Sequence, residues 1–144
     1  MAKNKEDKQQ VYTPEHIDKL RQNEIFVFGS NLKGWHGGGA AFIAYERFGA
    51  KLRISEGFTG KTYAIPTLDE NMEKVSVEEL AVSLSRFFVE VKKHQEYVFY
   101  LTKIGCGIAG WSVEEVRRIF WLVVDKFTYS GNLPNNLIIP KEFK

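Results

Sequence analysis

Two glycine-rich loops hold the residues best placed for chemistry in this chain of 144 residues. The first loop follows the apolar segment 25–28 and leads into a helix predicted to begin near Ala40. Glycine lets the backbone approach a ligand closely, and a helix N-terminus presents free N–H groups with a partial positive charge. This arrangement is typical of a site for an anion such as phosphate. The loop glycines are Gly29, Gly34, Gly37, Gly38 and Gly39.

A second loop of the same kind runs from Thr102 to Trp111 with the sequence T-K-I-G-C-G-I-A-G-W. Neither loop has the Gly-Lys-Ser/Thr ending of a Walker A motif. The second loop matches the G-x-G-x-x-G pattern of dinucleotide sites, but Asp125, about twenty residues on, falls inside a predicted helix. A standard nicotinamide dehydrogenase is therefore disfavoured. The pair of loops predicts a phosphate-bearing small molecule held between them, with tight packing turns as the alternative.

Several side chains in these loops have chemistry of their own. Asn31 either hydrogen-bonds a ribose hydroxyl or a diphosphate, or holds the turn. His36 lies among glycines, so we expect it outside the core, as a phosphate ligand or a proton carrier. Trp111, like Trp35, either covers an adenine or ribose or fills the core. Cys106 lies near a helix N-terminus, which lowers thiol pKa values, but without a partner it is better explained as a small filler.

Composition disfavours several classes of protein. The net charge of +2 is too small to indicate nucleic-acid binding. One cysteine excludes an intrachain disulfide, and the polar N-terminus lacks the apolar segment of a secretory signal, so we expect a cytoplasmic protein. No apolar run reaches the roughly 18 residues of a membrane span. The histidines and the cysteine form no metal-ligand pattern, so we expect no metal and no cofactor.

The spacing of apolar residues predicts alternating helices and strands. Serine with glutamate three residues later marks two helix starts, Ser76 to Glu79 and Ser112 to Glu115. Thr13-Pro14 indicates another helix start. The predicted helices cover residues 14–22, 39–48, 77–93 and 113–127. The predicted strands cover residues 25–28, 61–65, 97–102 and 137–139, with Pro66 ending the second and with Leu52 and Ile54 as an ambiguous further strand.

This alternation predicts an α/β fold: a three-layer α/β/α sandwich with a mostly parallel central sheet. Length predicts one domain over residues 13–144, preceded by a disordered tail over residues 1–12. Ligands of such sheets bind outside the carboxyl ends of the strands. Both glycine loops lie at such ends, so they converge if their strands are neighbours.

The order of elements and the two loops resemble the macro domain, an ADP-ribose-binding α/β module. The segment F-G-S-N-L-K-G-W-H-G-G-G-A-A looks like the macro segment in which an asparagine turn leads into glycines and an alanine-rich helix, with Asn31 at the asparagine position. The segment from Gly107 to Ser112 is similar to the second macro loop. Together with Y-A-I-P-T, these segments also resemble small macro-like proteins of bacteria and their phages. The resemblance covers about residues 24–140.

The resemblance implies binding of ADP-ribose or a related nucleotide, and it leaves hydrolysis of an ADP-ribosyl bond open. Gly37–Gly39 and Gly107–Trp111 would clasp the diphosphate, and Asn31 and Trp111 would face the distal ribose. The alternative is a protein-interaction module of a phage or mobile element without nucleotide turnover. Asn31 and His36 are the catalytic candidates. The expected ligand-binding residues are Gly29, Ser30, Asn31, Gly37, Gly38, Gly39, Ala40, Gly105, Cys106, Gly107, Ile108, Ala109, Gly110 and Trp111.

Overall fold

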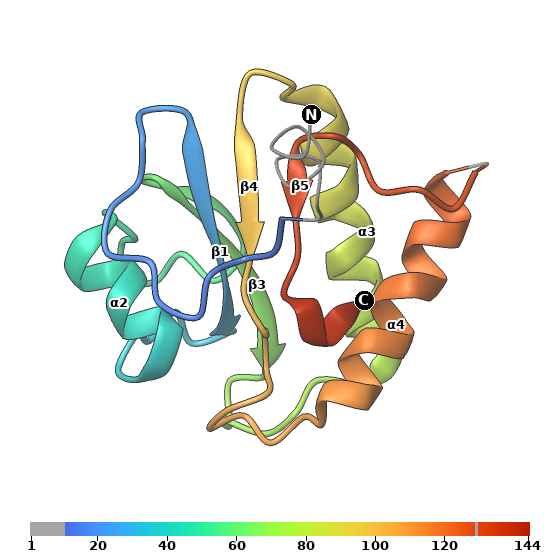
Figure 1. Cartoon of the computed structure of the whole chain (residues 1–144). Coiled ribbons are helices and arrows are strands. Elements are labelled where there is room, and N and C mark those ends of the chain that lie inside the picture. Colours follow the sequence, from blue (N-terminus) through green and yellow to red (C-terminus); the bar gives the residue numbers. More distant parts are fainter. Residues whose placement is uncertain (1–10, 129) are drawn as a thin grey trace.

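The computed structural model describes residues 11–128 and 130–144 (Figure 1). Residues 1–10 of the predicted tail lie outside the described residues. Within the described part, no helix combines the length and the apolarity needed to cross a membrane. The elements in chain order are β1 (Glu24–Asn31), α2 (Gly39–Arg47), β2 (Gly57–Thr59), β3 (Thr62–Leu68), α3 (Val77–Lys93), β4 (Val98–Leu101), α4 (Val113–Phe127), β5 (Leu137–Ile138) and the 3-10 helix η1 (Lys141–Phe143).

The described strands form one sheet in the order β2-β3-β1-β4-β5. The pairs of β1 with β3, β1 with β4, and β4 with β5 are parallel, and only β2 runs antiparallel to its neighbour β3. The central strand β1 is largely buried, as its unbroken apolar run predicts. The predicted α/β class with a mostly parallel sheet is confirmed.

Helices cover both faces of the sheet, with α2 on one side and α3 and α4 on the other (Figure 1). Successive residues of β1 point to opposite faces. Phe26 and Phe28 therefore pack against α2, whereas Ile25 and Val27 join the larger core beneath α3 and α4. This core is rich in aromatic rings that contact one another. Its fully buried phenylalanines are Phe87, Phe88, Phe99, Phe120 and Phe143.

Both predicted capping boxes are present. The Ser76 hydroxyl accepts a bond from the Glu79 N–H at 3.0 Å, and the Ser76 N–H donates to the Glu79 carboxylate at 2.8 Å. Ser112 and Glu115 make the same pair of bonds at the start of α4. The helix spans predicted from the apolar periodicity, 77–93 and 113–127, are confirmed.

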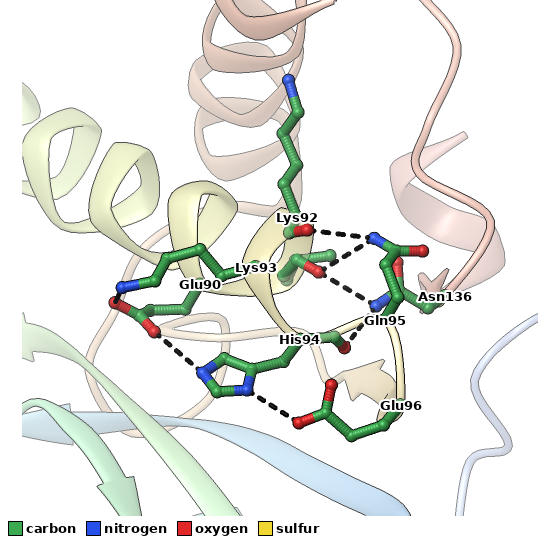
Figure 2. A network of polar contacts seen from close by, with 8 residues as sticks. Glu90, Lys92, Lys93, His94, Gln95, Glu96 and Asn136 are labelled. Carbon is green, nitrogen blue, oxygen red and sulfur yellow. Dashed lines mark hydrogen bonds and ion pairs between the residues drawn. The ribbon is translucent and has the colours of Figure 1, made fainter.

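The C-terminal end of α3 is closed by polar side chains (Figure 2). The Asn136 amide, which is buried beside β5, donates to the carbonyls of Val91 and His94, each at 3.0 Å. The His94 ring lies between two carboxylates, 3.4 Å from Glu90 and 3.0 Å from Glu96 (Figure 2). Gln95 donates to the carbonyls of Val91 and Lys92, so these two carbonyls near the end of α3 have side-chain partners. This end of α3 lies opposite to the glycine loops.

The helix predicted over residues 14–22 does not form. Thr13 does not cap a helix; its N–H and its hydroxyl donate to the carbonyls of Ile139, at 2.8 Å, and Ile138, at 3.2 Å. A short isolated helix is costly to nucleate, and these tertiary bonds favour an extended path instead. Ile17 and Leu20 still pack against the α2 side of the core. We call the segment Thr13–Asp18 the strap, because it crosses one side of a cavity described below.

Three strand predictions need correction. β1 continues through Gly29 to Asn31, so Asn31 ends a strand rather than standing in a loop. β3 continues through Pro66 to Leu68. A proline is tolerated there because β2 pairs only as far as Ala64, which leaves no ladder bond on that side for Pro66 to break. Leu52 and Ile54 form no strand and are exposed; the edge strand is β2 instead.

Candidate functional site

The two glycine loops converge because β1 and β4 are adjacent and parallel, so both chains leave the sheet at the same edge. They approach so closely that a Cβ atom on Gly29 would lie 3.0 Å from the Gly105 nitrogen. A side chain at position 29 would push against the backbone of the second loop, so packing at this point favours glycine.

A cleft of about 310 Å³ lies between the loops. Most of the predicted ligand-binding residues line it. These are Gly29, Ser30, Asn31, Gly37, Gly38, Gly39, Ala40, Gly105, Gly107, Ile108 and Ala109. Trp35, which the sequence offered as a possible cover for an adenine or ribose, also lines the cleft. The lining residues that the sequence did not single out are Ala41, Thr67, Leu68, Met72, Thr102, Lys103 and Ile104. Among the described residues that line it, Lys103 carries the only charge.

The N-terminus of α2 opens into this cleft without a cap. Gly38 occupies the N-cap position and has no side chain to bond the first N–H groups, and the first turn of α2 contains no acidic residue. By contrast, α3 and α4 each begin with a complete capping box and two glutamates. The first N–H groups of a helix have no partner inside it and carry a partial positive charge. At α2 these groups are left for an acceptor in the cleft.

The Asn31 side chain is buried and already engaged. Its Nδ2 donates to the Trp35 carbonyl at 2.7 Å, and its Oδ1 accepts from the Trp35 N–H at 3.1 Å. Of the two alternatives for Asn31, these bonds favour the one in which it holds the turn. Trp35 itself is 60% exposed and lies at the rim of the cleft.

His36 is not placed as its glycine neighbours suggest. Its side chain is buried, and its ring packs edge-on against Phe28 with centroids 5.4 Å apart. The Nε2 atom donates to the Lys51 carbonyl at 2.9 Å. The expectation that His36 stays out of a core is wrong, because the chain turns inward after Trp35 and carries the imidazole beneath the loop. His36 lines neither the cleft nor the larger cavity described below.

Trp111 is a core residue rather than a cover for the ligand. Its ring is 4% exposed and its Nε1 donates to the Thr67 carbonyl at 3.0 Å. It lies beneath Gly105, where a Cβ atom would come within 2.8 Å of the indole. Trp111 therefore supports the second loop from below, and neither it nor Gly110 lines the cleft.

Cys106 does not have the activated thiol that a nearby helix N-terminus would favour. Burial raises the pKa of the Cys106 thiol to about 11, and the cation of Lys103 lowers it only in part. The sulfur donates to the Ile104 carbonyl at 3.3 Å. A protonated, half-buried thiol is a poor nucleophile, which agrees with the prediction of a small filler.

A larger cavity of about 630 Å³ adjoins the cleft, and both are lined by Gly39, Ala40, Thr102, Lys103 and Gly107. The strap forms one wall of this cavity, and Cys106, Pro140 and Glu142 contribute to others. Lys103 stands where the two spaces meet, with its ammonium 3.5 Å from Glu15 of the strap and 3.6 Å from Glu142. Burial lowers the pKa of Lys103, but these two carboxylates outweigh it and hold the pKa above its ordinary value. Sequence reasoning did not single out Lys103. The signal that could have found it is its position directly after the predicted strand 97–102, at the edge of the sheet where ligands bind.

No protein-family model and no curated protein sequence matches this chain. Its structure is similar to the macrodomain of Mycobacterium tuberculosis DarG, with a TM-score of 0.63 and 17% identity over 91% of this chain and 97% of that chain. It is also similar to a macrodomain protein from Streptomyces coelicolor, with a TM-score of 0.53 and 12% identity over 87% of this chain and 92% of that chain. A protein of unknown function from Bacteroides thetaiotaomicron has a similar structure as well, with a TM-score of 0.57 and 11% identity over 85% of this chain and 89% of that chain. The chain therefore has a macro domain-like fold, as the loops predicted.

Proposed function

We propose that this protein binds ADP-ribose, or a closely related phosphate-bearing nucleotide, between its two glycine loops. The observation that carries the proposal is the uncapped N-terminus of α2, which opens into the cleft opposite the second loop. Backbone N–H groups at such a terminus have no acceptor within the helix, so they can donate hydrogen bonds to a diphosphate. The resemblance of both loops to macro domain segments, and the similarity in fold to two macrodomains, favour ADP-ribose over other anions.

The two adjoining spaces suit an elongated ligand. The diphosphate would occupy the cleft, where Lys103 is the only charged side chain among the described lining residues. The nucleoside would extend into the larger cavity, whose walls offer Glu15 and Glu142 as acceptors for hydroxyl or amino groups. Volumes of about 310 and 630 Å³ lie within the range of small-molecule sites.

Binding without turnover is better supported than hydrolysis. The amide of Asn31 is committed to Trp35, His36 is buried away from the cleft, and the Cys106 thiol is protonated at neutral pH. Among the described residues that line the cleft, there is also no carboxylate to activate water. We therefore propose a binding module, and Asn31 as a catalytic residue stays a prediction that turnover by an Asn31→Ala variant would test.

The test is calorimetric titration with ADP-ribose, with ADP and NAD as comparisons, on the wild type and two variants of Gly107. A Cβ at position 107 meets no atom within 4 Å, so a side chain fits there without disturbing the loop. Gly107→Glu places a negative charge beside the diphosphate site, and Gly107→Gln has the same size without the charge. We expect micromolar binding to the wild type, a loss of at least tenfold with glutamine, and no detectable binding with glutamate.

Equal affinity of the wild type and the glutamate variant for ADP-ribose would contradict this site. If no nucleotide gives heat with the wild type, and none raises the melting temperature, the alternative of a protein-interaction module gains support. A ligand present at a hundred times its Kd stabilises the native state by about 2.7 kcal/mol, so the melting experiment detects binding that produces little heat.

A further inference from the structure

Trp35 combines an exposed side chain with a firmly held backbone. Its indole is 60% exposed at the rim of the cleft, whereas the other described tryptophans, Trp111 and Trp121, are buried or partly buried. A large aromatic side chain left in solvent stabilises no core. Its position is therefore explained better by what it contacts outside the folded chain than by packing.

The turn that carries Trp35 is fixed from several sides. The buried amide of Asn31 uses both its donor and its acceptor on the Trp35 backbone. The next residue back, Gly34, donates to the Asn31 carbonyl at 2.9 Å and accepts from the Arg53 N–H at 2.8 Å. A Cβ on Gly37 would collide with Trp35 Nε1, so the indole lies directly over a glycine of the cleft. The backbone of Trp35 is therefore fixed before any ligand arrives, with the ring lying over Gly37.

Trp35 lines the cleft but not the larger cavity. Sheet order places the end of β3 on one side of β1 and the end of β4 on the other. Leu68, at the end of β3, and Met72, in the turn after it, line the cleft with Trp35 but do not line the larger cavity. The shared wall of the two spaces lies instead beside Thr102 and Lys103 at the end of β4. Trp35, like Leu68 and Met72, thus lines the cleft outside the wall that the two spaces share.

We propose that Trp35 is a platform for a planar ring attached to the ligand beyond the diphosphate. This inference rests on the proposed function, in which the diphosphate occupies the cleft and the nucleoside occupies the larger cavity. A second ribose would then extend from the diphosphate into the part of the cleft lined by Asn31 and Trp35, which do not line the larger cavity. A group on that ribose would emerge beside the indole. The ligand class that the site favours is then a dinucleotide whose second ribose still carries an aromatic ring, rather than ADP-ribose with a free hydroxyl there.

The chemistry of the indole favours a cationic ring. Tryptophan has the strongest negative face of the aromatic side chains, and no charged residue among the described lining of the cleft stands at this end. A pyridinium ring stacked on Trp35 would gain both contact area and a cation–π attraction. An exposed contact of this kind corresponds to a gain in affinity of about two- to fivefold.

The experiment measures the ratio of the ADP-ribose Kd to the NAD Kd, by calorimetry, for the wild type, Trp35→Phe and Trp35→Ala. We expect a ratio of about two to five for the wild type, a smaller ratio with phenylalanine, and a ratio near one with alanine. Phe42→Ala is the matched control, because Phe42 is 45% exposed on α2 and does not line the cleft. Its ratio should equal that of the wild type.

Asn31 acts in this scheme as a positioning residue for Trp35. Asn31→Ala should lower the ratio toward one, since the indole is no longer held, whereas a purely structural role would weaken both ligands alike and leave the ratio unchanged. Quenching of Trp35 fluorescence by iodide gives a second measurement. NAD should protect the exposed indole from iodide more than ADP-ribose does.

The outcomes separate the two proposals. If neither ligand binds the wild type, the proposed function is wrong and this inference falls with it. If ADP-ribose binds but the ratio is one or less in the wild type, or is unchanged by Trp35→Ala, the nucleotide site stands and the ring platform is overturned.

Discussion

The Cys106 thiol faces the larger cavity but is held in its protonated form. Burial is the main cause of its raised pKa, and the nearby Lys103 ammonium, which favours the thiolate, compensates only in part. Lys103 is itself paired with Glu15 at 3.5 Å and with Glu142 at 3.6 Å. A cysteine beside a cation and a helix N-terminus is in this case unreactive because of its surroundings.

We expect iodoacetamide to modify Cys106 on the order of 100-fold more slowly at pH 8 than it modifies a free thiol. The rate should increase about tenfold for each pH unit up to pH 9.5, because the thiol pKa is about 11. Mass spectrometry of the intact protein follows the reaction, with urea-unfolded protein as the control. A rate that levels off below pH 9 would contradict the raised pKa.

The helices α2, α3 and α4 all begin at the site end of the sheet, but they begin in two different ways. Two of them, α3 and α4, start with a serine and glutamate capping box, and their first N–H groups are satisfied inside the protein. Only α2 starts at a bare glycine. The helices that stabilise the core are thus capped, and the helix that meets the cleft is left open.

The α4 capping box should contribute measurably to stability. We expect Ser112→Ala to lower the free energy of unfolding by about 1 kcal/mol, because the Glu115 N–H loses its acceptor. Urea unfolding followed by circular dichroism measures this change. Equal stability of the variant and the wild type would show that water replaces the serine hydroxyl without cost.

Glu115→Gln is the companion variant, since glutamine can still accept the bond from the Ser112 N–H but has no charge. That bond, with help from Lys74, holds the pKa of Glu115 below its ordinary value. A lowered carboxylate pKa stabilises the fold above the unfolded pKa, and this contribution disappears as the pH falls through the folded pKa. The wild type should therefore exceed Glu115→Gln in stability at pH 7 and lose that advantage in acid.

The elements that the sequence predicted well are those in which local signals agree. Apolar residues at helical spacing and a capping box coincide in both α3 and α4, so their bounds were predictable. Thr13 shows the opposite case, because its hydroxyl suits either a helix cap or a strand carbonyl, and the carbonyl belongs to residue 138, far along the chain. Pro66 was misleading because only the short length of β2 makes a proline acceptable in β3.

The candidate site was predictable in its backbone and not in its side chains. Glycine spacing and strand ends located both loops, since these follow from local sequence. The direction in which a loop side chain points is decided by packing with distant residues. His36 and Trp111 turn inward, while Trp35, which has a similar glycine-rich neighbourhood, stays in solvent. Nothing in the local sequence separates these cases.

The molecule as a whole depends on the larger core between the sheet and the helices α3 and α4. Phe120 lies at the centre of that contact, with its ring centroid 5.6 Å from Phe88 of α3 and 6.1 Å from Phe143 of η1. Phe143 lies in the C-terminal 3-10 helix, so this one side chain joins α3, α4 and the end of the chain. The walls of the larger cavity that Pro140 and Glu142 provide are held by the same contacts.

We expect Phe120→Ala to lower the free energy of unfolding by about 3–5 kcal/mol, because the ring is fully buried and its removal leaves a cavity. Leu122→Ala is the matched control on the same helix. Leu122 is 60% exposed, so this change should stay within about 0.5 kcal/mol of the wild type. Similar urea midpoints for the two variants would contradict the central role given to this core.

The sheet has short edges on both sides. β2 pairs through three residues and β5 through two, and the part of β3 that extends beyond β2 contains Pro66, which has no N–H to donate. A strand from another molecule needs a row of free donors and acceptors to attach. Within residues 11–128 and 130–144 the edges of the sheet offer very short rows. Intermolecular strand addition, and the domain swapping or amyloid growth that begins with it, therefore has little to start from at these edges.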